Sequence, residues 1–167
     1  MSPRRADLDI VVAGRTGPNH LVRFGETDSP LDERGRADVE ESVRGWSITA
    51  PVICGPERAT RETAALLSPA VIVDAGLAGI NVGKWAGRLP EEIPGAELRA
   101  WFADPTARPH GGETVVEFVD RIVEWIRGAP DVAVLVVSGP VAQALRCDDA
   151  SSFFTADVVP GRRYRLG

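Results

Sequence analysis

Long apolar runs, cysteines and positive charge are all scarce in this 167-residue sequence. No apolar stretch approaches the roughly 20 residues that a membrane-spanning helix needs. The amino-terminal residues also have no apolar signal core behind them. These absences predict a cytoplasmic protein that does not associate with membranes.

Positive charge is outnumbered, with 19 Lys and Arg residues against 24 Asp and Glu residues and a formal net charge of -5. A nucleic-acid-binding surface usually needs a broad basic field, so we expect no nucleic-acid partner. Short arginine clusters stand near both ends of the chain, and such short charge runs are typical of solvated termini.

The two cysteines, Cys54 and Cys147, are too few for a disulfide framework or a metal cluster. Cys54 follows an apolar run and is expected in the core. Cys147 stands among charged residues, where either a packed or a reactive thiol is possible. Asp148 and Asp149 lack a third ligand nearby in the sequence, so we predict no metal, and nothing points to a cofactor.

Apolar runs of strand length alternate with helical patterns along the chain. The expected strands cover residues 9–13, 51–54, 70–73 and 131–137, with a possible edge strand at 162–166. The expected helices cover residues 32–46, 58–67, 96–103, 114–126 and 140–145. This alternation predicts a single domain over residues 1–167 of the α/β class, with three layers and a mainly parallel sheet covered by helices on both faces.

Ligands of such sheets bind beyond the carboxyl ends of the strands. The segments in which to look for a site are therefore those that follow the expected strands or face them, namely residues 13–23, 55–61, 77–87, 109–114 and 138–141.

Several anchors with regular spacing follow the first expected strand. This strand ends in Val-Ala-Gly-Arg-Thr, and Asn19 and Arg23 stand six and ten residues after Ala13. The element Asp-Ser-Pro-Leu and a glycine follow within residues 28–35. This arrangement resembles the opening of the histidine phosphatase (phosphoglycerate mutase-like) superfamily. There the strand ends in Arg-His-Gly-Glu-Thr, and the nucleophilic histidine falls on Ala13 of this chain.

A second register competes with the first. Residues 21–27 read Leu-Val-Arg-Phe-Gly-Glu-Thr, which is similar to the family motif with Phe24 in place of histidine. This segment does not follow an expected strand, and it leaves no room before the Asp-x-Pro-Leu element. The motif needs its strand–turn context, which favours the first register. Either register lacks the nucleophile.

Three further segments match family motifs in the spacing of most residues, but each lacks the catalytic group of its motif. In the motif Ser-x-x-x-Arg-Ala-x-Gln-Thr-Ala, the phosphate-binding arginine falls on Ala59. Its neighbours Arg58 and Arg61 can replace it only if the helix start shifts. In Leu-x-Glu/Asp-x-x-x-Gly-x-Trp-x-Gly, the acid falls on Gly79. In Val-Ser/Thr-His-x-x-Val, the second histidine falls on Gly139.

Glu113, Thr114 and Arg121 match the family element Gly-Glu-Ser…Arg. The resemblance covers residues 9–145, and the chain looks short at its carboxyl end beside the usual family member. It implies an α/β fold in which a phosphoryl group passes to a histidine. This chemistry needs an imidazole nucleophile, cations around the phosphoryl oxygens and an acid for the leaving oxygen.

Alanine and glycine supply none of these groups, so we predict a pseudoenzyme that is inactive as a phosphatase or mutase. The emptied pocket suits a non-catalytic module that binds a small molecule or a protein partner. The alternative is an enzyme with repurposed chemistry. The candidate pocket residues are Arg15, Asn19, Arg23, His110 and Glu113.

Each candidate also has an ordinary structural interpretation. Asn19 is a good turn residue, His110 is one of two histidines in expected loops, and Glu113 suits a helix start. Because closed twofold assemblies are common, a homodimer is possible. The sequence does not identify the ligand.

Overall fold

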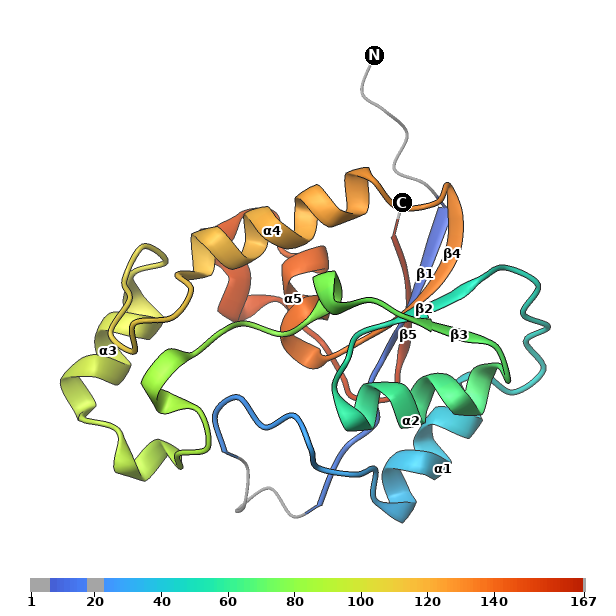
Figure 1. Cartoon of the computed structure of the whole chain (residues 1–167), viewed down its shortest axis with the longest axis horizontal. Helices are drawn as coiled ribbons and strands as arrows, with labels where there is room; N and C mark the ends of the chain where they lie inside the picture. The colour runs from blue at the N-terminus through green and yellow to red at the C-terminus, as the bar shows by residue number, and fades with distance from the viewer. Residues whose placement is uncertain (1–6, 18–22, 167) are drawn as a thin grey trace.

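The structure, a computed structural model, describes residues 7–17 and 23–166. Asn19 and the first two residues of the competing motif at 21–27 lie outside the described residues. Five strands form one sheet in the order β3-β2-β4-β1-β5 (Figure 1). They are β1 (Asp7–Val12), β2 (Val52–Cys54), β3 (Val71–Val73), β4 (Val132–Val137) and β5 (Arg163–Leu166).

The first four strands pair in parallel, and β5 runs antiparallel along β1. The expected strands, including the edge strand near the carboxyl end, are therefore confirmed. Strand β4 is the central strand of the sheet. Its residues 133–137 are all buried, as its continuous apolar run predicts for a strand covered on both faces.

The helices are α1 (Glu33–Ser42), α2 (Arg58–Leu67), α3 (Gly95–Ala103), α4 (Val115–Arg127) and α5 (Gly139–Arg146). Side chains of a strand alternate between the two faces of a sheet. Ile10 and Val12 accordingly pack into the apolar cluster of α4 and α5, whereas Val11 joins the cluster that holds Ala64 of α2. With α1 packed on α2, this confirms three layers (Figure 1).

Helix α1 is shorter than the expected helix over 32–46. It begins where the Asp32 side chain accepts the N–H of Gly35 at 2.6 Å. It ends at Ser42, and Gly45 soon adopts a positive φ of 75° that an α-helix cannot continue. Helix α4 begins as expected, because the Thr114 hydroxyl accepts the N–H of Glu117 at 3.0 Å.

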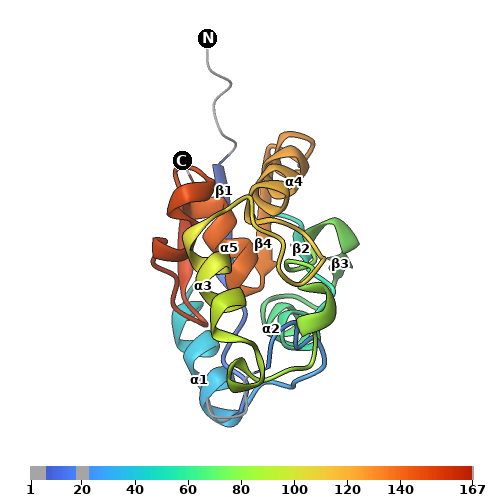
Figure 2. The same ribbon diagram turned by 90° about the vertical axis from the view of Figure 1, so that its left-hand side faces the viewer.

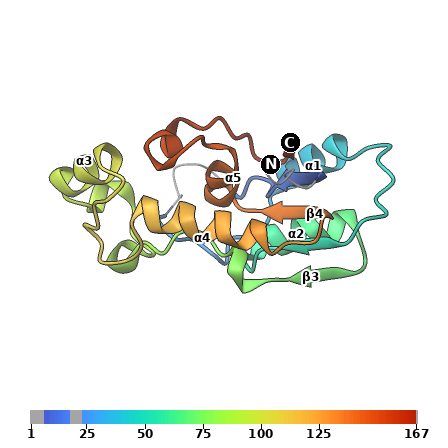
Figure 3. The same ribbon diagram turned by 90° about the horizontal axis from the view of Figure 1, so that it is seen from above.

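Between β3 and α3 the chain makes three single helical turns, at Ala75–Leu77, Gly83–Trp85 and Pro90–Glu92. This segment carries α3 away from the sheet to one end of the molecule (Figures 2 and 3). Among the described helices, none is long and apolar enough to cross a membrane.

The carboxyl ends of three strands are tied together by backbone hydrogen bonds. The N–H of Ala13, just past β1, donates to the carbonyl of Val137 at 2.8 Å, and the N–H of Gly55 donates to that of Val136 at 3.0 Å. The segments that follow β1, β2 and β4 therefore start side by side, at the edge where the α/β architecture places its ligands.

Candidate functional site

A cavity of about 800 Å³ lies at this edge of the sheet. Its lining comes from the segments after β1, β2 and β4, together with the loop that follows β3. The lining residues are Thr16, Arg23, Gly25, Glu26, Thr27, Asp28, Ser29, Pro56, Glu57, Ala59, Arg61, Ala78, Gly79, Ile80, Asn81, Val82, Ala86, Ser138 and Pro140.

Among the lining residues that the structure describes, the ionisable ones are two arginines, Arg23 and Arg61, and three carboxylates, Glu26, Asp28 and Glu57. Two positive charges against three negative charges leave the lining with one excess negative charge. Such a lining does not favour a polyanion.

Both arginines of the lining are exposed, and each donates a hydrogen bond to a backbone carbonyl, at 2.9 Å from Arg23 and 3.0 Å from Arg61. Arg58 does not line the cavity and pairs instead with Glu62 at 3.5 Å. Helix α2 begins at Arg58, as expected, so no shift of the helix start brings Arg58 into the cavity.

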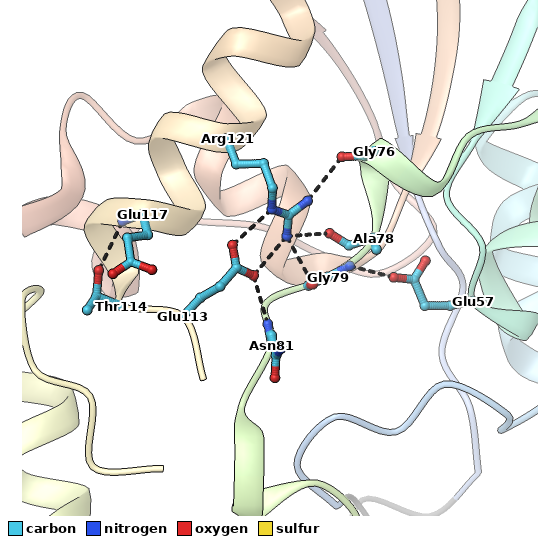
Figure 4. A network of polar contacts seen from close by, with 9 residues as sticks. All are labelled: Glu57, Gly76, Ala78, Gly79, Asn81, Glu113, Thr114, Glu117 and Arg121. Atoms are coloured by element: carbon cyan, nitrogen blue, oxygen red, sulfur yellow. Dashed lines mark hydrogen bonds and ion pairs between the residues drawn. The ribbon is translucent and has the colours of Figure 1, made fainter. Parts of the chain in front are cut away.

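Glu57 is the least exposed of the charged lining residues, with 9% of its surface accessible. Its Oε1 accepts the N–H of Gly79 at 2.7 Å, while its Oε2 has no hydrogen-bond partner (Figure 4). The hydroxyl of Ser138 is likewise buried without a partner. A Cβ added at Gly79 would lie 3.4 Å from Glu57 Oε1 and 3.6 Å from Ser138 Oγ. Three separate segments of the chain therefore meet at this point.

Glu113, a candidate pocket residue from its motif, does not line the cavity. Its carboxylate lies 2.9 Å from Nε and 2.9 Å from Nη2 of Arg121, and it accepts the N–H of Asn81 at 2.9 Å. Burial would raise the pKa of Glu113, but the hydrogen bonds from Arg121 and Asn81 outweigh it and lower the pKa. Glu113 is a partner of Arg121 rather than a group free to meet a ligand.

Arg121 in turn holds the loop that carries Gly79. Its guanidinium donates to the carbonyls of Gly76, Ala78 and Gly79 at 3.1, 3.1 and 3.3 Å. Figure 4 shows Arg121 and Glu113 on one side of this loop and Glu57 on the other. The Glu113–Arg121 pair, which matches a family motif, therefore stabilises the loop that lines the cavity, on the opposite side of that loop from Glu57.

His110 also lies away from the cavity. Its ring packs edge-on between Trp85 and Trp101, with ring centroids 5.0 and 4.4 Å away. Nδ1 accepts the N–H of Gly112 at 2.9 Å, and Nε2 is buried without a partner. His110 joins this aromatic cluster because the loop after α3 packs against the segment of Trp85. The spacing of these residues in the sequence does not predict the contact.

We expect the folded protein to lose stability as the pH falls below 6.5, the ordinary pKa of histidine. Burial, with the nearby cations Arg108 and Lys84, lowers the pKa of His110 in the folded state. The unfolded chain therefore takes up the proton first, and the free energy of unfolding falls with pH until the lower pKa of the folded state is reached. Urea unfolding between pH 7.5 and pH 5.5 measures this slope.

His110→Asn should flatten the slope, because the Asn Oδ1 keeps an acceptor for Gly112 but does not titrate. The matched control is the same substitution at His20, the other histidine of the chain. An unchanged slope in His110→Asn, or a flat one in His20→Asn alone, would contradict this assignment.

Arg15 is not part of the lining either, because its Nε pairs with Asp32 at 3.1 Å beside the start of α1. Asn19 lies outside the described residues. Among the candidate residues that the structure describes, Arg23 is the one that lines the cavity. Glu57 and Ser138 were missed. Their segments were among those selected for inspection, but glutamate before a helix and serine after a strand are ordinarily solvated caps.

The family model of the histidine phosphatase superfamily (branch 1) matches residues 10–147. The chain belongs to this superfamily. The glucosyl-3-phosphoglycerate phosphatase of Mycobacterium tuberculosis is 32% identical in an alignment 148 positions long that covers 82% of this chain and 63% of that protein. The chain thus spans less than two thirds of the length of this relative.

Solved structures of the superfamily agree. The crystal structure of a phosphoglycerate mutase from Thermus thermophilus has a TM-score of 0.78 and 26% identity, covering 96% of this chain and 92% of that one. The native mycobacterial glucosyl-3-phosphoglycerate phosphatase has a TM-score of 0.70 and 26% identity, covering 89% and 82%. Both have the fold seen here.

Two of the four residues at the catalytic motif positions line the cavity. Ala59 and Gly79 line it, Ala13 directly follows β1, and Gly139 starts α5 beside Ser138. In the first register Ala13 directly follows β1, whereas the residues just before the competing motif lie outside the described part of the chain, and the Phe24 ring lies 5.1 Å from that of Trp85. The strand–turn context therefore supports the first register.

The thiols stand apart from this site. Cys54 is fully buried, as expected, and burial raises the pKa of both Cys54 and Cys147. Cys147 is therefore held as a thiol and not as a reactive thiolate. Over residues 7–17 and 23–166, no group of three His, Cys, Asp or Glu side chains is placed to hold a metal ion.

Proposed function

We propose that this chain is a catalytically degenerate member of its superfamily that binds a small molecule in the cavity. The observation that carries the proposal is the lining itself. The described part of the lining contains no histidine, and it presents a methyl group at Ala59 and no side chain at Gly79. These are the positions where the motifs of the superfamily have the phosphate-binding arginine and the acid.

The superfamily reaction depends on positioned charges more than on any other factor. A methyl group at Ala13 cannot accept a phosphoryl group, and Ala59 cannot make the bidentate contact that an arginine makes with phosphate. Gly79 and Gly139 have no proton to donate and no charge to contribute. Loss of the nucleophile alone removes the covalent route, and the remaining losses remove the stabilisation of the transition state.

The cavity keeps the size and lining of a binding site although it lacks the groups for the superfamily reaction. A cavity of about 800 Å³ falls in the range of small-molecule sites, and its lining combines apolar residues with a few polar groups. The alternative of repurposed catalysis needs titratable groups that converge on a ligand. His110 and Glu113, on which that alternative depended, are held in contacts outside the cavity.

The purified chain is expected to release no phosphate above background from p-nitrophenyl phosphate or from glucosyl-3-phosphoglycerate. The second substrate is chosen because the relative from M. tuberculosis is named as its phosphatase. Mass spectrometry after incubation should show no phosphohistidine. The measurement is phosphate release by the unaltered chain and by His20→Ala and His110→Ala variants.

Turnover that disappears with either substitution, or a phosphohistidine at either position, would overturn the proposal. Turnover that is the same in all three proteins, and that separates from the chain on further chromatography, belongs to a contaminating phosphatase and leaves the proposal intact.

A further inference from the structure

The Glu57 carboxylate lines the cavity without a cationic partner among the described residues. We call the part of the cavity next to Glu57 and Ser138 its floor. Glu57 is 9% exposed, and none of the ion pairs in the described part of the chain includes it. One carboxylate oxygen accepts the N–H of Gly79, and the other has no partner. A buried charge without a counter-charge is costly, and it is normally kept where a partner completes it.

The surrounding chain makes room for this carboxylate. A Cβ at Gly55 would stand 2.7 Å from Glu57 Oε2, closer than real Cβ contacts come. A side chain at Gly79 would start 3.4 Å from Oε1. Both glycines stand at motif positions where the superfamily has larger residues, a serine and an acid. The two positions next to the Glu57 carboxylate thus lack the side chains that the superfamily motifs have there.

We propose that the cavity binds its ligand through a protonated amino group that is held by Glu57 and Ser138. This inference rests on the proposed function and names the class of ligand. An ammonium group has three donors and no acceptor, which complements the free Oε2 of Glu57 and the hydroxyl oxygen of Ser138. Both oxygens are covered by the surrounding chain, so binding through them requires the Glu57 and Ser138 side chains to turn toward the ligand.

Charge around the rest of the described lining is balanced, because Glu26 and Asp28 offset the two arginines. The one negative charge in excess is therefore that of Glu57 itself. A phosphate ester placed on the floor would meet the Glu57 carboxylate at short range, and like charges at such distances repel. The amino group is therefore favoured at the floor over a phosphate.

The test is calorimetric titration at pH 6.5 with matched probes. The first set is glucose, glucosamine, glucose 6-phosphate and glucosamine 6-phosphate, which varies the amine and the phosphate independently on one scaffold. The second is the pair cyclohexanol and cyclohexylamine. The amine should bind about tenfold more tightly than its hydroxyl counterpart, as one charge-assisted hydrogen bond predicts. The phosphate should bring no gain.

Glu57→Gln should reduce the amine preference to within about twofold, because the amide keeps an acceptor for Gly79 but removes the charge. Ser138→Ala should weaken the amine without abolishing the preference. The matched control is Glu40→Gln, which neutralises an exposed carboxylate of α1 outside the cavity lining and should change the preference by less than about twofold. Urea unfolding of each variant verifies that it is folded.

Equal affinity within both amine and hydroxyl pairs, no binding of any probe, or an undiminished amine preference in folded Glu57→Gln would overturn the inference. Tighter binding of glucose 6-phosphate without phosphate release would also overturn it, but would leave the proposed non-catalytic function standing. Release of phosphate during the titration would instead contradict the proposed function.

Discussion

Replacing Arg121 by alanine is expected to lower the free energy of unfolding by about 3 kcal/mol, at the lower end of the cost of breaking a buried ion pair. The guanidinium makes two contacts of 2.9 Å with Glu113 and donates to three backbone carbonyls of the loop over residues 76–79. Its removal leaves the 19%-exposed Glu113 side chain without its cation and these carbonyls without a donor. The loop that places Gly79 against Glu57 should loosen as a result.

Urea unfolding measures the loss, and a thermal scan should show a midpoint lower by about 6–12 °C for a domain of this size. Arg121→Lys keeps the charge but not the planar fork, so it should recover less than half of the loss. Arg127→Ala is the matched control on the same helix. Its pairing with Glu124 is exposed, and its removal should cost less than about 0.5 kcal/mol. Similar losses in Arg121→Ala and Arg127→Ala would show that the loop does not depend on Arg121.

Local patterns were sufficient to predict the sheet. The expected strands matched because each apolar run is bounded by glycine, proline or aspartate, which are local signals that end a strand. The end of helix α1 was harder to predict from the sequence. Apolar residues continue beyond Ser42 to Trp46, but Gly45 adopts a left-handed conformation that does not continue the helix, and the apolar period alone does not indicate this end.

Side-chain direction at the site could not be predicted in the same way. His110 lies in a loop, as expected, yet its ring contacts Trp85 and Trp101 and does not line the cavity. The environment of Glu57 likewise depends on Gly79, which reaches it from a separate loop. Motif spacing identifies which segments surround the cavity, but not which of their side chains point into it.

The residues at the superfamily motif positions fall into two groups. Glu113 and Arg121 hold the loop behind the cavity, and they match the motif. Ala13 and Gly139 fall at positions where the superfamily motifs have histidines, and they do not match the motifs. A chain that depends on its fold, but not on the superfamily reaction, would keep the first group and lose the second.

Restoring the superfamily groups is expected to create phosphatase activity only if Glu57 is also replaced. The combined variant carries Ala13→His, Ala59→Arg, Gly79→Glu and Gly139→His. A Cβ at Gly139 meets nothing within 4 Å, and one at Gly79 makes contacts no closer than 3.4 Å, so these two positions have room for side chains. With Glu57 in place, however, the restored acid and the incoming phosphate both meet an existing carboxylate.

Adding Glu57→Leu removes this carboxylate and should raise turnover of p-nitrophenyl phosphate by about 10²–10⁴-fold over the combined variant, the range that one positioned acid contributes. The control is the same protein with Ala13 retained, which has every restored group except the nucleophile and should show no turnover. Equal activity with and without the restored histidine would mean that the reaction does not pass through position 13, and the assignment of Ala13 as the lost nucleophile would be wrong. A clear difference that appears only after Glu57 is removed would show that this buried carboxylate, and not the missing groups alone, separates the cavity from the chemistry of its superfamily.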